Sequence, residues 1–120
     1  DLSGFHVSAA VRTDSGAVYV GTNQENASYP VGNCAERVVL SVSNMQSPNE
    51  AMREMALVYR DPSGHNRQAL APCGMCRQAL REQTYRQKKA IRLIMGTEDG
   101  EILATDNADE LLPISFTLKP

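Results

Sequence analysis

The sequence predicts an α/β fold, a mixed five-stranded sheet with helices packed on its faces. Short apolar segments typical of strands alternate with two segments of helical periodicity, and the elements follow the order β-β-α-β-α-β-β. Of the 120 residues, 42% are hydrophobic and 22% are charged, which is enough to bury one core without disulfides. We therefore expect a single domain over residues 1–120.

The expected strands are short, and turn-forming residues separate them. They cover residues 5–12, 17–21, 55–59, 91–95 and 101–104. The first two flank Asp14-Ser15-Gly16, a sequence typical of a tight turn, so they should pair as a hairpin. Residues 108–112 should form one helical turn.

The two expected helices cover residues 34–45 and 73–86. Pro72 is suited to the first turn of the second helix, because a proline there loses no hydrogen bond. Apolar residues recur about every 3.6 positions and should pack on the sheet. They are Ala35, Val38, Val39, Val42 and Met45 in the first helix, and Met75, Ala79 and Leu80 in the second.

The charge of the chain favours a small substrate over a polymer. The formal net charge is -2, and acidic and basic residues interleave instead of forming the basic stripe typical of nucleic-acid binding. No apolar run approaches the roughly 18–20 residues that cross a bilayer, and no secretory signal precedes the first strand. Three cysteines, an odd number, argue against a disulfide framework. We therefore expect a protein of the reducing cytoplasm, with no membrane partner.

The three cysteines all lie where helices should begin. A helix start carries a partial positive charge that favours the thiolate, which is the form that binds metal. Cys73 and Cys76 are three positions apart and share one side of a turn, whereas Cys34 opens the other helix. Zinc prefers four ligands, so three thiolates would leave one position for water. His6 or His65 could instead close a structural Cys₃His site.

Two residues beside Cys34 suit a hydrolytic zinc site. Arg37 can offset the charge of the thiolates, which would allow the pKa of a zinc-bound water to fall towards about 7. Glu36 can reach back from the first helical turn and move protons at the metal. Glu36 could also form a capping box with Asn33, and Cys73 and Cys76 could be a redox pair.

Five motifs together resemble the small single-domain zinc-dependent cytidine deaminases. "FHVSAAV", "NQENASY", "CAER", "PCGMCRQ" and "LLPISF" occur in that order and cover nearly the whole chain. The resemblance implies one zinc ion per subunit, held by Cys34, Cys73 and Cys76, with Glu36 as the catalytic proton shuttle. It implies hydrolysis of cytidine and deoxycytidine to uridine and deoxyuridine with release of ammonia, in pyrimidine salvage. It also implies a homotetramer, and a leading helix that would lie before residue 1.

The resemblance also implies a set of residues that contact the nucleoside. Asn23 and Glu25 match the contacts to the ribose hydroxyls, Phe5 matches a residue packing on the pyrimidine, and Phe116 would come from a neighbouring subunit. The full expected set is Phe5, Asn23, Glu25, Tyr29, Ala35 and Phe116. Ser8 and residues 30–32 depart from the pattern of the family and affect the expected substrate preference.

Two alternatives remain open at the level of sequence. The same chemistry could act on another cytosine-containing substrate, such as a blasticidin-type antibiotic. The chain could also be a non-catalytic structural zinc module. Editing of a polynucleotide is disfavoured, because aromatic residues make up 5% of the chain and tryptophan is absent.

Overall fold

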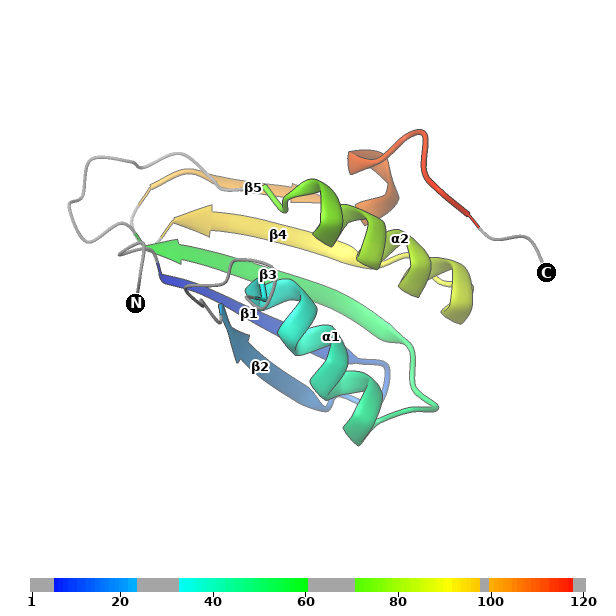
Figure 1. The fold of residues 1–120 in the computed structure, drawn as a ribbon. Coiled ribbons are helices and arrows are strands. Elements are labelled where there is room, and N and C mark those ends of the chain that lie inside the picture. The colour runs from blue at the N-terminus through cyan, green and yellow to red at the C-terminus, as the bar shows by residue number, and fades with distance from the viewer. Residues whose placement is uncertain (1–5, 24–32, 61–70, 98–99, 118–120) are drawn as a thin grey trace.

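Five strands form one mixed sheet in the order β2-β1-β3-β4-β5 (Figure 1). The computed structural model describes residues 6–23, 33–60, 71–97 and 100–117. The strands are β1 (His6–Thr13), β2 (Val18–Thr22), β3 (Met52–Arg60), β4 (Arg92–Thr97) and β5 (Ile102–Thr105). The helices are α1 (Ala35–Gln46), α2 (Gly74–Gln87) and the short 3₁₀ helix η2 (Ala108–Leu111). The predicted fold class and element order are confirmed.

The pairing of β3 with β4 is parallel, and all the other strand pairs are antiparallel. A parallel pair needs a crossover, and α2 provides it. Along each strand, every second side chain points toward the helices, because successive side chains of a strand point to opposite faces of the sheet. In neighbouring strands they lie opposite one another, for example Ala9 beside Leu57 and Leu57 beside Met95, and all three are buried.

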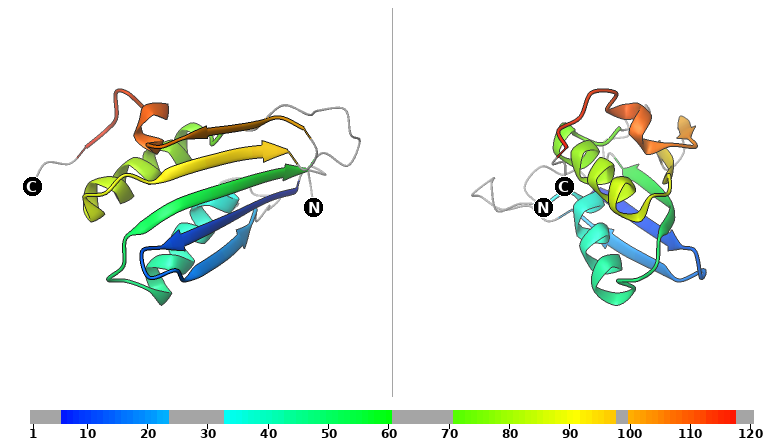
Figure 2. Two further views of the ribbon diagram at one scale, coloured as in Figure 1. Left: turned by 180° about the vertical axis from the view of Figure 1, so that it is seen from behind. Right: turned by 90° about the vertical axis from the view of Figure 1, so that its right-hand side faces the viewer.

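Both helices lie on the same face of the sheet (Figures 1 and 2). α1 packs over β1 and β2, where Gly21 allows a close approach. A Cβ at Gly21 would lie 3.0 Å from Cγ1 of Val38 and 3.1 Å from the backbone nitrogen of Val39. The side-chain amide of Gln87, at the end of α2, bonds both the N–H and the carbonyl of Met52 at 2.9 Å. The beginnings of α1 and α2 lie at the same end of the sheet (Figure 1).

Three details of the predicted elements are wrong. β3 begins at Met52, three residues earlier than predicted, because Glu54 still pairs with Arg12 and a bulge in β3 at Arg53 lets Met52 pair with Thr13. Pro72 precedes the N-cap of α2 and so does not occupy its first turn. Met45 and Met75 are 78% and 64% exposed, because they lie on the outer sides of their helices and not on the sheet.

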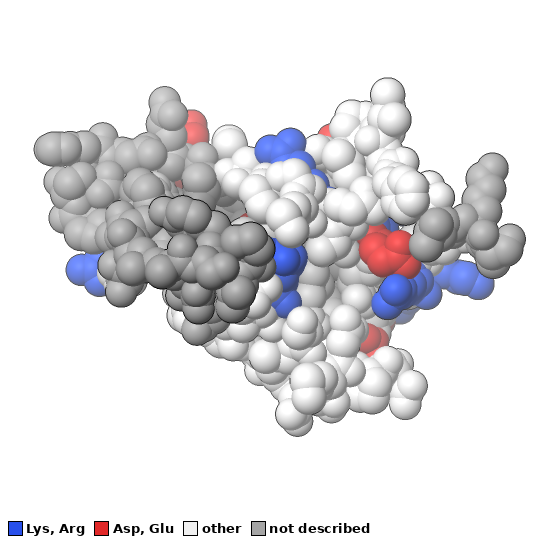
Figure 3. Space-filling model, in the orientation of Figure 1, with Lys and Arg blue, Asp and Glu red and all other residues white. Residues whose placement is uncertain are grey.

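The face of the sheet away from the helices carries a row of paired charges. Arg12 and Arg92 both form ion pairs with Glu54, which lies between them on β3, and Arg92 also pairs with Asp106. On the helix-covered side, positive and negative side chains are mixed over the described part of the surface (Figure 3). The described helices include none that is both long and apolar enough to cross a membrane.

Candidate metal centre

The centre is built from two helix starts with the same backbone geometry. Cys34 and Cys73 are the N-cap residues of α1 and α2, and both have extended backbones, with ψ of 153° and 170°. Their carbonyls accept the first helical hydrogen bonds, from Val38 and Arg77. The thiol of Cys34 does not cap its own helix. The sulfurs are therefore available to a ligand at the positive ends of two helices.

The three sulfurs surround one point. Sγ of Cys73 lies 3.4 Å from Sγ of Cys76 and 3.8 Å from Sγ of Cys34, and all three lie within 4.8 Å of one another. A tetrahedral zinc ion with Zn–S bonds of about 2.3 Å separates its sulfur ligands by about 3.8 Å. The cluster therefore fits zinc, and all three cysteines are free thiols. In the described part of the chain, the candidate metal ligands that gather here are these three cysteines.

The three thiols differ in environment. Burial opposes ionisation of Cys73, but hydrogen bonds from the backbone N–H and thiol of Cys76, from the Cys34 thiol and from the backbone of Met75 lower its pKa. Burial, followed by the negative charge of Glu36, raises the pKa of Cys76 well above its usual range. Cys73 is exposed whereas Cys76 is fully buried. The cluster is thus accessible from one side, and a cation is needed to hold all three as thiolates.

Glu36 lies beside the sulfurs in the first turn of α1. Its side chain is 5% exposed, and it is close enough for its charge to act on Cys76. The capping-box alternative is wrong, because Cys34 and not Asn33 is the N-cap, so Glu36 stands two positions after the cap instead of three. A buried carboxylate next to a metal site can take up and release protons.

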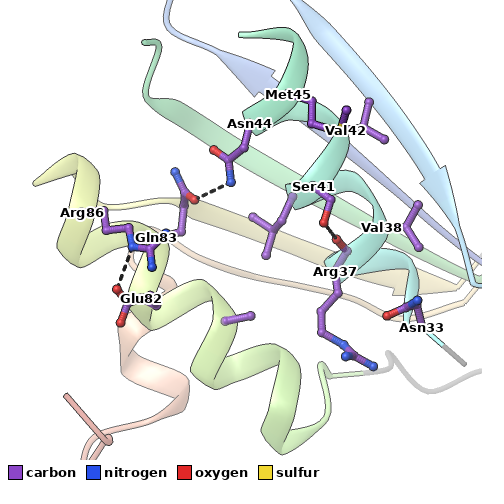
Figure 4. A pocket seen from close by; sticks show the side chains of 12 residues that line it. Asn33, Arg37, Val38, Ser41, Val42, Asn44, Met45, Glu82, Gln83 and Arg86 are labelled. Carbon is purple, nitrogen blue, oxygen red and sulfur yellow. Dashed lines mark hydrogen bonds and ion pairs between the residues drawn. The ribbon is translucent and has the colours of Figure 1, made fainter. Parts of the chain in front are cut away.

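Arg37 lies close enough to interact with two of the three sulfurs. Burial disfavours the charged guanidinium and lowers the pKa of Arg37. Hydrogen bonds and charge interactions with the sulfurs of Cys34 and Cys76 outweigh this effect, so the pKa of Arg37 is raised overall. The side chain extends from α1 toward the beginning of α2 (Figure 4). Its Nε is buried and has no hydrogen-bond partner within the described residues. Arg37 therefore lies where the sequence predicts a cation that supports the thiolates.

A groove of about 560 Å³ runs between α1 and α2 and has Arg37 at one end (Figure 4). Its floor includes apolar side chains of α1, and its far end is polar. Glu82 and Arg86 pair there, and Asn44 donates a hydrogen bond to Gln83 at 3.1 Å. None of the three cysteines lines the groove, and Arg37 lies between it and the sulfur cluster.

The structure describes three of the six residues predicted to contact a nucleoside. Oδ1 of Asn23 accepts a hydrogen bond from the N–H of Val7 at 3.2 Å, which orients its amide at the end of β2. Ala35 is fully buried as the first residue of α1. Phe116 is 69% exposed, so it is not a core residue. Phe5, Glu25 and Tyr29 lie outside the described residues, as does His65, and His6 is not part of the sulfur cluster.

Sequence reasoning missed two residues that directly follow Cys76. Arg77 donates to the carbonyl of Pro72 at 2.8 Å and to that of Leu111 at 3.0 Å. Gln78 bonds the backbone of Phe116. Their partners at positions 111 and 116 are more than thirty residues away. No local pattern could have identified those contacts.

Three converging thiols, a buried carboxylate and an arginine define a metal-binding α/β domain with a polar, ionisable site. A family model for the cytidine and deoxycytidylate deaminase zinc-binding region matches residues 1–91. The chain belongs to this family. Zinc is its cofactor, and Cys34, Cys73 and Cys76 are the group that could hold it.

Individual relatives support the same conclusion. A cytidine deaminase of Halalkalibacterium halodurans is 34% identical over 115 residues, which cover 96% of this chain and 80% of that protein. The crystal structure of cytidine deaminase from Burkholderia pseudomallei matches with a TM-score of 0.79 and 35% identity, over 95% of this chain and 84% of that one. A blasticidin-S deaminase of Bacillus cereus is 28% identical over 114 residues, which cover 93% of this chain and 77% of that protein.

Proposed function

We propose that this chain catalyses the hydrolytic deamination of cytidine and deoxycytidine to uridine and deoxyuridine, with release of ammonia. The observation that carries the proposal is the arrangement of three sulfurs within 4.8 Å of one another beside the buried Glu36. Three thiolates leave a fourth tetrahedral position for water, which distinguishes a catalytic from a closed structural zinc site. The cytidine deaminase relatives supply the substrate class.

The proposed mechanism assigns the proton transfers to Glu36. When bound, zinc supplies the positive charge that activates the attacking water. Glu36 accepts a proton from that water and donates it to N3 of the pyrimidine as the C4–O bond forms. It then carries the second proton to the amine as the C4–N bond breaks, and ammonia leaves. The burial of Glu36 keeps bulk water away from these transfers.

The remaining residues are assigned to charge balance and to the substrate. Arg37 offsets the thiolates through the sulfurs of Cys34 and Cys76. Asn23, whose amide is oriented by Val7, would bond a ribose hydroxyl together with Glu25. The other proposed nucleoside contacts are Phe5, Tyr29, Ala35 and Phe116. We further propose a single domain over residues 1–120, assembly as a homotetramer, and a cytoplasmic role in pyrimidine salvage.

A panel assay tests this proposal. Ammonia release is measured with cytosine, cytidine, deoxycytidine, deoxycytidine monophosphate and blasticidin S, while metal analysis counts zinc in the same sample. We expect about one zinc per chain and turnover of the two nucleosides. A carboxylate near the ribose should disfavour the monophosphate through charge repulsion. One bound zinc without turnover of any substrate would instead indicate a structural zinc module.

Deamination of a blasticidin-type antibiotic is the second candidate function. It is favoured by the 28% identity to the Bacillus cereus blasticidin-S deaminase over 93% of this chain. Such a substrate shares the cytosine ring, so the same sulfur cluster and Glu36 would serve it. The ratio of kcat/KM for blasticidin S to that for cytidine decides between the two candidates.

A further inference from the structure

The side-chain amide of Gln78 forms two hydrogen bonds with the backbone of Phe116. Its side-chain Nε2 donates to the carbonyl of Phe116 at 2.7 Å, and its Oε1 accepts from the N–H of Phe116 at 3.2 Å. One amide thus satisfies both backbone groups of a residue 38 positions away, as a neighbouring strand would do. Gln78 lies two residues after Cys76, so this contact is made in the second turn of the helix that carries two of the sulfurs.

The rest of the segment is attached to the same helix by polar contacts. Arg77 donates to the carbonyl of Leu111 at 3.0 Å, and Arg81 donates to Oγ of Ser115 at 3.2 Å. Further along α2, Thr84 donates to Oδ1 of Asp109 at 2.7 Å. Residues 109–116 therefore follow one side of α2 and are held largely through hydrogen bonds.

Leu111 packs against the core, but the apolar side chains further along the segment do not hold it in place. Ile114 is 91% exposed and Phe116 is 69% exposed. An exposed phenylalanine gains little from burial in its own chain, so its position depends on the fixing of its backbone. The contact with Gln78 therefore fixes the backbone of Phe116 against α2 while its ring stays exposed on the surface.

We infer that Gln78 is a positioning residue that fixes Phe116 for contact with the nucleoside. This inference rests on the proposed function, in which Phe116 lies near the substrate of a neighbouring subunit. Gln78 itself acts on the backbone of Phe116 and need not touch the substrate. The backbone that carries the exposed ring is then already in place and does not have to be ordered when the nucleoside binds.

Gln78→Leu removes both hydrogen bonds while keeping a similar volume. We expect amide exchange at Phe116 to accelerate about tenfold and KM for cytidine to rise about five- to tenfold, with kcat and zinc content close to wild type. Gln78→Glu keeps the acceptor for the N–H of Phe116 but loses the donor to its carbonyl, so an intermediate effect is expected. Gln83→Leu is the matched control, because Gln83 lies on α2 but bonds Asn44 and Gln87 instead.

A double-mutant comparison separates positioning from a general effect on stability. In a Phe116→Ala background, Gln78→Leu should add little to KM, because the ring that it positions is gone. The inference is overturned if exchange at Phe116 does not change in Gln78→Leu, or if the two effects on KM add in full. Absence of turnover by the wild-type chain would refute the proposed function alone, because amide exchange would still report whether Gln78 fixes the segment.

Discussion

Sγ of Cys34 lies 3.8 Å from Sγ of Cys73, although the two residues are 39 positions apart and open different helices. The distance is the edge length of a zinc–thiolate tetrahedron. It arises because α1 and α2 lie on the same face of the sheet with their N-termini together (Figure 1). The metal centre is therefore a product of helix placement, with one sulfur from α1 and two from α2.

Removing one sulfur should remove the metal. In Cys34→Ser and Cys76→Ser, we expect purified protein to contain less than about a tenth of the zinc of wild type, since a hydroxyl is a far weaker ligand than a thiolate. Metal analysis after dialysis is the measurement. Met75→Leu is the control, because Met75 lies between two of the cysteines and is 64% exposed. Full zinc in both serine variants would show that the cluster is not the metal site.

Glu36→Gln should separate metal binding from turnover. The amide keeps the shape of the carboxylate but cannot carry protons, so we expect kcat for cytidine to fall by about 10²–10⁴-fold while zinc content is unchanged. Glu82→Gln is the control, since Glu82 pairs with Arg86 at the distant end of the groove. Wild-type turnover in Glu36→Gln would mean that another group moves the protons.

Loss of the Arg37 guanidinium should lower the affinity of the sulfur cluster for zinc, although the site should still fill at high zinc concentration. Arg37→Ala leaves the charge of the thiolates uncompensated, so zinc affinity or kcat should drop by about 10–100-fold. Competition with a chelator measures the affinity. Arg86→Ala, at the other end of the same groove, should match wild type in both readouts. Equal affinity and turnover in Arg37→Ala would remove Arg37 from the charge balance.

Gly21 should be intolerant of any side chain. A Cβ there meets Val38 at 3.0 Å and the backbone of Val39 at 3.1 Å, so Gly21→Ala has to push α1 away from the sheet. We expect the free energy of unfolding to fall by about 1–3 kcal/mol, measured by urea titration. Gly74→Ala is the control, because a Cβ at Gly74 meets nothing within 4 Å, and it should leave stability unchanged or slightly raised.

Glu50 should make folding stability depend on pH in the acid range. Hydrogen bonds from the side chains of Ser15, Ser47 and Thr13 hold its pKa below the ordinary 4.5. A carboxyl group whose pKa is lower in the folded state stabilises the fold above its unfolded pKa, and this contribution is lost as pH falls through the folded pKa.

The free energy of unfolding should therefore be higher for wild type than for Glu50→Gln. This difference should be largest above about pH 5 and shrink as the solution is acidified below that value. Urea titrations of both proteins at pH 7, 5, 4 and 3 measure it. The sulfur cluster is common to both, so its own acid sensitivity cancels in the difference. An advantage that does not vary with pH would contradict the assignment.

Much of this protein could be predicted from local sequence. The order of strands and helices follows from hydrophobic periodicity, which depends only on neighbouring residues. The 3.4 Å approach of Cys73 to Cys76 follows from their spacing of three positions at a helix start. The composition and charge already pointed away from a polymer substrate.

Tertiary structure alone decided which distant residues meet. The parallel pairing of β3 with β4 and the position of both helices on one face bring Cys34 to Cys73, and no local propensity encodes that contact. The same holds for the contact of Gln78 with Phe116, and for the exposure of Met45, which a periodic pattern had predicted to be buried. The reason is physical: secondary structure depends on neighbouring residues, whereas long-range contacts depend on the packing of the whole chain.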